Sequence, residues 1–217
     1  MFLGVLFAAV TTAGFPPAGT YRYAASMAGQ PIGSWSVDVA HDAASAELDE
    51  RSSASIMGMQ ASAAVALVLG PNLAPLKYTG DYRTPAQSPS VTVDLTAESA
   101  TAVGALTTKE REIALAPGTH HFVVIEPGLL AGLFALPAQL AAWKESTVTW
   151  ITPATAQAQP LTVSTAAPGS RPSDVPNADA VLSVERPIAV TIWYDPTTLV
   201  PDEISVPSEN AVLRRAR

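Results

Sequence analysis

The sequence contains no cysteine among its 217 residues. This absence excludes disulfide bonds, thiolate catalysis, cysteine-ligated metals and a lipid-modified N-terminal cysteine. Charge is also scarce, because only 14% of the residues are Asp, Glu, Lys or Arg, and the formal net charge is −7. A nucleic-acid-binding protein would show a basic patch, so we expect no nucleic-acid partner. With 48% hydrophobic residues, the chain is too apolar to be disordered.

The sequence also lacks the common catalytic motifs. It has no G-x-S-x-G elbow, no phosphate-binding loop and no H-E-x-x-H helix. Of its three histidines, His120 and His121 are neighbours in an expected strand and therefore point to opposite faces. The acid pairs Asp49-Glu50 and Asp202-Glu203 diverge for the same reason, and we expect solvated faces or strand ends there. We therefore predict no enzyme activity, no metal site and no cofactor.

Only two long apolar runs are present. The first, residues 2–10, is followed by Thr11, Thr12 and Ala13, which is typical of a secretory signal over residues 1–13. Nine residues are too few to span a bilayer. No Lys or Arg occurs before Arg22, so a first β-strand is the alternative for this run. The signal predicts an exported protein, periplasmic, in the cell envelope or secreted.

The second run, residues 128–143 (GLLAGLFALPAQLAAW), has no charge and has large side chains at helical spacing. Pro137 would kink this helix or open a second short one. Sixteen residues with an internal proline are too short for a membrane span, so we expect none in the mature chain. A helix that is apolar on every side is usually buried. Glu126 lies just before this segment, and its negative charge is expected to cap the positive N-terminal end of the helix dipole.

Most of the remaining chain alternates between apolar and polar residues, with Gly, Pro, Asn and Asp between the runs. Trp35, Val37 and Val39, for example, would share one face of a strand over residues 34–40. One buried and one wet face is typical of an antiparallel sheet. A loop over residues 28–33 would join this strand to one over 21–23. The expected strands span residues 21–23, 34–40, 47–51, 60–69, 77–83, 91–96, 122–126, 147–152, 161–164, 181–185, 188–195 and 203–206.

The aromatic residues give the sequence its only site-like signal. If several face one cavity, they would line an apolar pocket with a few polar groups, although single rings can also be ordinary core residues. Combined with the apolar run, this pattern predicts a ligand-binding set: Trp35, Tyr78, Leu129, Leu133, Phe134, Trp150 and Trp193.

Three segments and the single helical interruption resemble the bacterial lipoprotein-carrier superfamily of LolA and LolB. The segments are residues 19–23 (GTYRY) with the turn that follows, 73–78 (LAPLKY) and 192–201 (IWYDPTTLVP). In the third, Asp195-Pro196 would open a turn between two strands. The resemblance implies a mainly β domain over residues 19–213, with one strongly curved antiparallel sheet, an open half-barrel, and a helical plug over 128–143. Outside this domain, the clustered Arg214, Arg215 and Arg217 predict a basic, frayed tail over residues 214–217, with contact to anionic lipid or a partner as the alternative.

That resemblance also implies a concave face that binds acyl chains. The chain lacks the acylated cysteine of LolB, and no ligand residue of the carriers matches one by one, so no site is transferred. Our hypothesis is an exported, non-catalytic binding protein for a lipid or other apolar ligand. The alternative is a structural or interaction module of the cell envelope, in which the helix completes the core or docks to a protein partner.

Overall fold

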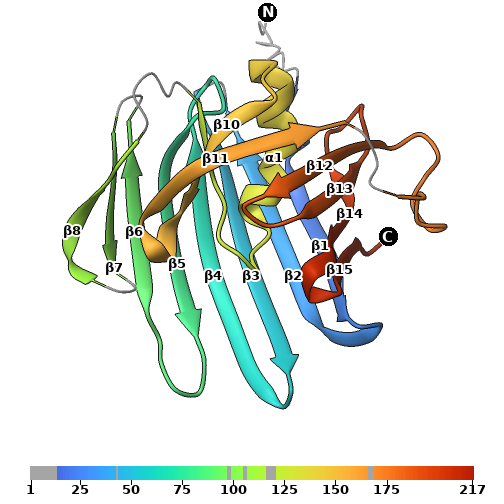
Figure 1. The fold of residues 1–217 in the computed structure, drawn as a ribbon, viewed down its shortest axis with the longest axis horizontal. Helices are drawn as coiled ribbons and strands as arrows, with labels where there is room; N and C mark the ends of the chain where they lie inside the picture. The colour runs from blue at the N-terminus through green and yellow to red at the C-terminus, as the bar shows by residue number, and fades with distance from the viewer. Residues whose placement is uncertain (1–13, 43, 97–98, 105–106, 116–120, 166–168) are drawn as a thin grey trace, which may run out of the picture.

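The computed structural model describes residues 14–217, apart from residues 43, 97–98, 105–106, 116–120 and 166–168 (Figure 1). The expected signal segment, residues 1–13, and His120 lie outside this part. The strands are β1 (Gly19–Met27), β2 (Gln30–His41), β3 (Ala46–Ile56), β4 (Met59–Leu69), β5 (Pro75–Arg83), β6 (Ser90–Leu95), β7 (Ala100–Gly104), β8 (Thr107–Ile113), β9 (Phe122–Val124), β10 (Thr147–Thr152), β11 (Gln157–Ser164), β12 (Ala180–Arg186), β13 (Val190–Tyr194), β14 (Pro201–Val206) and β15 (Ala211–Arg215). The helices are α1 (Ala131–Trp143) and two 3-10 turns, η1 (Pro153–Thr155) and η2 (Pro207–Glu209).

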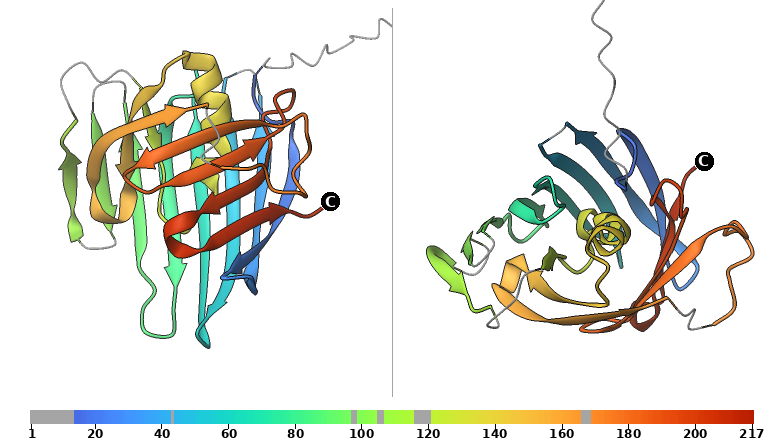
Figure 2. Two further views of the ribbon diagram at one scale, coloured as in Figure 1. Left: turned by 45° about the vertical axis from the view of Figure 1, so that its right-hand side comes forward. Right: turned by 90° about the horizontal axis from the view of Figure 1, so that it is seen from above.

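All the strands belong to one sheet, which has the order β8-β7-β6-β5-β4-β3-β2-β1-β15-β14-β13-β12-β11-β10-β9. The mainly β prediction is therefore confirmed. The sheet is not closed into a barrel, since β8 and β9 are its two ends. It curves around α1, which lies within the curve (Figure 2).

The prediction of a purely antiparallel sheet is wrong at one end. β9 pairs with β10 in parallel, with Val123 opposite Trp150. The physical reason is the connection between them, because α1 carries the chain back so that β10 runs in the same direction as β9. The sequence analysis also missed β7, β8 and β15, which are short or rich in charge.

Two tight hairpins set the register of the first four strands. Ala28 and Gly29 between β1 and β2 have φ angles of 49° and 77°, and Met57 and Gly58 between β3 and β4 have 53° and 80°. Positive φ at both central residues is characteristic of a type I′ turn, whose twist matches the flanking strands. The expected hairpin is confirmed, but its loop over residues 28–33 is wrong: the turn takes two residues, and β2 begins at Gln30.

The alternating pattern predicts the two faces of the sheet correctly. Trp35, Val37 and Val39 are buried on the concave face, while Ser34 and Asp38 are exposed. The same alternation runs through β3 and β4 and encloses one continuous apolar core. The alternation in the sequence therefore predicts which face of these strands α1 covers.

Helix α1 is shorter than the expected segment 128–143 and is a single helix, in spite of Pro137. All ten residues from Ala131 to Leu140 are buried. A side chain on Gly132 would lie 2.1 Å from the Val124 carbonyl oxygen, so glycine is needed for close packing on β9. Within the part of the chain that the structure describes, no helix is long and apolar enough to cross a membrane.

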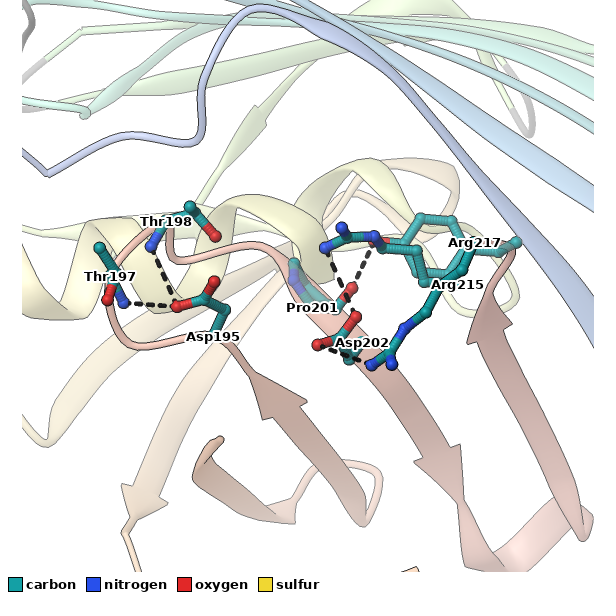
Figure 3. A network of polar contacts seen from close by, with 8 residues as sticks. Asp195, Thr197, Thr198, Pro201, Asp202, Arg215 and Arg217 are labelled. Carbon is teal, nitrogen blue, oxygen red and sulfur yellow. Dashed lines mark hydrogen bonds and ion pairs between the residues drawn. The ribbon is translucent and has the colours of Figure 1, made fainter. Parts of the chain in front are cut away.

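The predicted frayed tail is wrong for Arg214 and Arg215, which belong to β15. The Arg214 guanidinium lies 2.7 Å from the buried Glu203 carboxylate and 2.9 Å from that of Asp174. Arg215 and Arg217 lie 3.4 and 3.7 Å from Asp202 (Figure 3). Through these ion pairs the basic residues link β15 and the C-terminus to β14, which sequence position alone does not reveal.

Candidate functional site

An apolar pocket lies on the concave side of the sheet, beside the N-terminal end of α1. It has an empty volume of about 810 Å³, its open mouth included. The pocket wall comes from segments far apart in the sequence: β1, β2, the end of β3, the connection from β9 to α1, the first turn of α1, β10, the loop between β12 and β13, the last three strands and η2. The residues lining it are Ala25, Ser26, Met27, Ile32, Trp35, Ile56, Ile125, Glu126, Pro127, Gly128, Leu129, Leu130, Leu133, Trp150, Ile188, Val190, Ile204, Val206, Glu209, Ala211 and Leu213.

Two tryptophans of this wall are held by the connection between β9 and α1. The Trp150 indole donates a hydrogen bond of 2.7 Å to the Ile125 carbonyl oxygen. The Trp35 indole donates one of 3.3 Å to the carbonyl oxygen of Gly128. Both indole N–H groups are therefore satisfied within the protein, so neither ring presents an unpaired donor to the pocket.

A buried carboxylate holds the helix beside this pocket. Glu50 of β3 is 1% exposed, and its Oε2 accepts the backbone N–H groups of Leu130 at 2.8 Å and Ala131 at 2.7 Å. These are among the amides that a helix leaves unpaired at its N-terminus, and Leu130 itself supplies no side-chain cap. Glu50 therefore caps α1 from across the core, a carboxylate at the positive end of the helix dipole.

Burial raises the pKa of Glu50 to about 7, although the two backbone hydrogen bonds act in the opposite direction. Its other oxygen, Oε1, is buried and has no hydrogen-bond partner among the residues that the structure describes. The prediction that Asp49-Glu50 is a solvated pair is thus wrong for Glu50. The alternation of β3 contained the signal, because Glu47, Asp49 and Arg51 on the wet face leave Glu50 on the buried one.

The expected role of Glu126 is also wrong. Its Oε2 accepts the Ala154 backbone N–H at 2.8 Å and so caps η1 rather than α1. Burial is the main cause that raises the pKa of Glu126, and the hydrogen bond from Ala154 lowers it. Glu126 therefore remains in the pocket wall as a partly buried acceptor.

Of the seven residues predicted to bind ligand, the structure brings four together. Trp35, Leu129, Leu133 and Trp150 line the pocket. The other three do not line it, although all are buried. They are Tyr78, Phe134 and Trp193.

Each of these three has another environment. The Tyr78 hydroxyl lies 2.9 Å from that of Tyr82, and Phe134 packs with its ring centroid 5.2 Å from that of Tyr21. The Trp193 ring lies under the Arg171 guanidinium, 4.4 Å from ring centroid to Cζ. Arg171 also donates a hydrogen bond of 2.7 Å to the Asp179 carbonyl, which holds the loop before β12 over Trp193.

The sequence analysis missed the contribution of the last strands to the pocket. Val190, Ile204 and Leu213 all line it, and each lies in a short strand near the C-terminus. Their apolar character was visible, but the pairing of β15 with β1 brings them to the pocket. That pairing joins segments far apart in the sequence, so no local pattern of residues predicts it.

The polar residues near the C-terminus have structural partners. The Asp195 carboxylate accepts the Thr197 and Thr198 backbone N–H groups at 2.7 and 3.4 Å (Figure 3). This confirms the turn expected at Asp195-Pro196, between β13 and β14.

His121 stacks on Trp143 and lies 2.9 Å from Glu145. Among the residues that the structure describes, no group of three His, Asp or Glu side chains could hold a metal ion.

No protein-family model matches the chain, and no curated protein matches its sequence. Two solved structures match the chain over most of its length, at low sequence identity and low TM-score. A beta-barrel-like protein of the domain of unknown function DUF1849 from Brucella abortus is 10% identical, covering 93% of this chain and 95% of its own, with a TM-score of 0.48. A DUF1089 family protein from Pseudomonas aeruginosa is 6% identical, covering 96% of each chain, with a TM-score of 0.46. At these values neither likeness carries an argument about function.

Proposed function

We propose that the protein is a non-catalytic binding protein for a lipid or another apolar ligand, exported to the cell envelope. The observation that carries the proposal is the pocket between the concave face and the N-terminal end of α1. Its wall is almost wholly aliphatic or aromatic, and such a concave, apolar surface is what small-molecule sites use. The curved sheet and α1 would then act as an open half-barrel and its plug, as the resemblance to lipoprotein carriers implies.

Displacement of water from this wall would supply the binding energy. Each Å² of apolar surface that ligand and protein remove from water contributes about 25 cal/mol before the costs of association. Trp35, Trp150 and Leu133 are already buried and fixed by the core, so little side-chain ordering opposes binding. Export is proposed on the apolar run of residues 2–10 alone.

A fluorescence titration tests this function. The neutral dye N-phenyl-1-naphthylamine should become strongly fluorescent on binding the full-length protein. Leu133→Trp places a larger side chain in the pocket and should weaken dye binding about tenfold or more, as expected for the loss of about 1.4 kcal/mol. Leu76→Trp is the matched control, since Leu76 is 46% exposed and lies away from the pocket. Equal dye binding by both variants and the wild type would overturn the proposal.

The alternative, an envelope interaction module without a small-molecule ligand, is favoured by one feature. The β3–β4 hairpin exposes Ile56, Met57 and Met59, which are 36%, 95% and 63% accessible. Met57→Ser with Met59→Ser should leave folding intact, because neither side chain belongs to the core. If this double variant loses association with the cell envelope while dye binding is absent from the wild type, the interaction module is the better description.

A further inference from the structure

The charges in the pocket wall all have the same sign. Among the described residues that line the pocket, the ionisable side chains are Glu126 and Glu209, and no Lys, Arg or His is present. The two acids come from different elements: Glu126 lies in the connection from β9 to α1, and Glu209 lies in η2. A ligand therefore meets acidic groups from two elements of the wall, and no cation among the described residues that line it.

Glu126 is held in a position to contact a bound molecule. The Ala154 backbone N–H donates to its Oε2 at 2.8 Å, which ties the carboxylate to the wall. A carboxylate has about four lone-pair sites, so one hydrogen bond leaves it able to accept another from a ligand. Glu209 is exposed and lies on the rim, where it meets solvent as well as the pocket.

The pocket is therefore unfavourable for anions. A carboxylate or phosphate near an apolar wall loses hydration and needs a cation or several donors in return. Here it would instead lie near Glu126 or Glu209, and like charges at low effective dielectric repel. A hydroxyl or an ammonium group has the opposite preference, because it can donate a hydrogen bond to either acid.

We infer that the pocket selects amphiphiles whose polar end is an uncharged or cationic hydrogen-bond donor, an alcohol or an amine, over those ending in a carboxylate or phosphate. This inference rests on the proposed function and specifies the chemical class of its ligand. It follows from the sign and the placement of the lining charges together with the apolar wall.

The test compares three probes that share one ten-carbon chain. Decanol, decylamine and decanoate are each titrated at pH 7.5 against the full-length protein loaded with N-phenyl-1-naphthylamine, and displacement gives an apparent Kd for each probe. The measured quantity is the Kd of decanoate divided by that of decanol or decylamine. The three probes differ in how strongly water solvates them. This difference is the same for every protein variant, so it cancels when the ratio is compared between variants.

The double variant Glu126→Gln with Glu209→Gln removes both charges from the wall. Both ratios should fall about tenfold relative to the wild type. Glu47→Gln with Asp49→Asn is the matched control, since both residues are exposed on the outer face of β3 and carry the same total charge. Unchanged ratios in this control would show that the effect comes from the wall and not from the net charge of −7.

The outcomes separate the two proposals. If the dye binds and Leu133→Trp blocks it, but both ratios are the same in the wild type and the wall variant, the charge selectivity is wrong and the binding function stands. Equal falls in the wall variant and the outer-face control would also overturn the selectivity. If the dye does not bind at all, the proposed function itself is wrong.

Discussion

Glu50 makes the most demanding prediction about this fold, because a carboxylate that is almost inaccessible to solvent holds the N-terminus of α1. In Glu50→Ala the N–H groups of Leu130 and Ala131 lose their acceptor, and both residues are at most 1% exposed. An unsatisfied buried donor costs about 1–3 kcal/mol. The free energy of unfolding should therefore fall by roughly 2–6 kcal/mol for the two groups.

Glu50→Gln should instead raise the free energy of unfolding above that of the wild type at high pH. The amide oxygen can accept both N–H groups, so the cap is retained and the buried charge is removed. Burial raises the pKa of Glu50 from the ordinary 4.5 to about 7, so between these values the native state holds a proton that the unfolded state has released. Stability is then lost as pH rises through this window, by about 3 kcal/mol for one such group.

Urea unfolding of the wild type, Glu50→Gln and Glu50→Ala at pH 5, 6, 7 and 8 measures both effects. Burial also raises the pKa of Glu126, and burial together with the Asp202 carboxylate raises that of Asp179 to about 6, so each contributes a slope of the same sign. The difference between the wild type and Glu50→Gln isolates Glu50. This difference should shift by about 3 kcal/mol in favour of Gln between pH 5 and 8.

Two results would refute this reasoning. A difference between the wild type and Glu50→Gln that stays constant from pH 5 to 8 would mean that Glu50 does not titrate in this window. A loss of stability in Glu50→Gln as large as that in Glu50→Ala at pH 8 would mean that the carboxylate charge, and not the accepted hydrogen bonds, holds α1.

Two other substitutions test the packing of α1 and the end of the sheet. Gly132→Ala places a methyl group 2.1 Å from the Val124 carbonyl oxygen and should cost about 1–3 kcal/mol in thermal unfolding. Gly169→Ala, where no atom of the described residues lies within 4 Å of the new methyl group, should cost almost nothing. Equal effects of the two would contradict the close contact between α1 and β9. Arg214→Ala leaves the buried Glu203 carboxylate without its cation and should cost about 1–3 kcal/mol, since half of the arginine is exposed and solvent screens the pair. Arg217→Ala should change the urea midpoint little, because Arg217 lies 3.7 Å from Asp202, which also has Arg215 at 3.4 Å. A loss as large as that of Arg214→Ala would contradict this difference between the two pairs.

The sequence by itself determined the strands whose residues alternate and the face that each strand buries. It also predicted a buried helix within residues 128–143, because a segment apolar on all sides has no stable place in water, and the structure buries Ala131 to Leu140 of it. The turn at Asp195 and four residues of the pocket wall, Trp35, Leu129, Leu133 and Trp150, follow from the same local patterns. These features depend on neighbours within a few residues, which a sequence displays directly.

Only the tertiary structure decided the partners of the polar groups. Glu50 reaches α1 across 80 residues of chain, while Glu126, five residues before the first residue of the helix, caps η1 instead. Likewise, the pairing of β1 with β15 brings Leu213 to the pocket and gives Arg214 a role in the sheet. The parallel β9–β10 pair depends on the path of α1. All four features have the same physical reason. Hydrophobic alternation determines which side of a strand is buried, but the path of the whole chain determines which residues the buried side contacts.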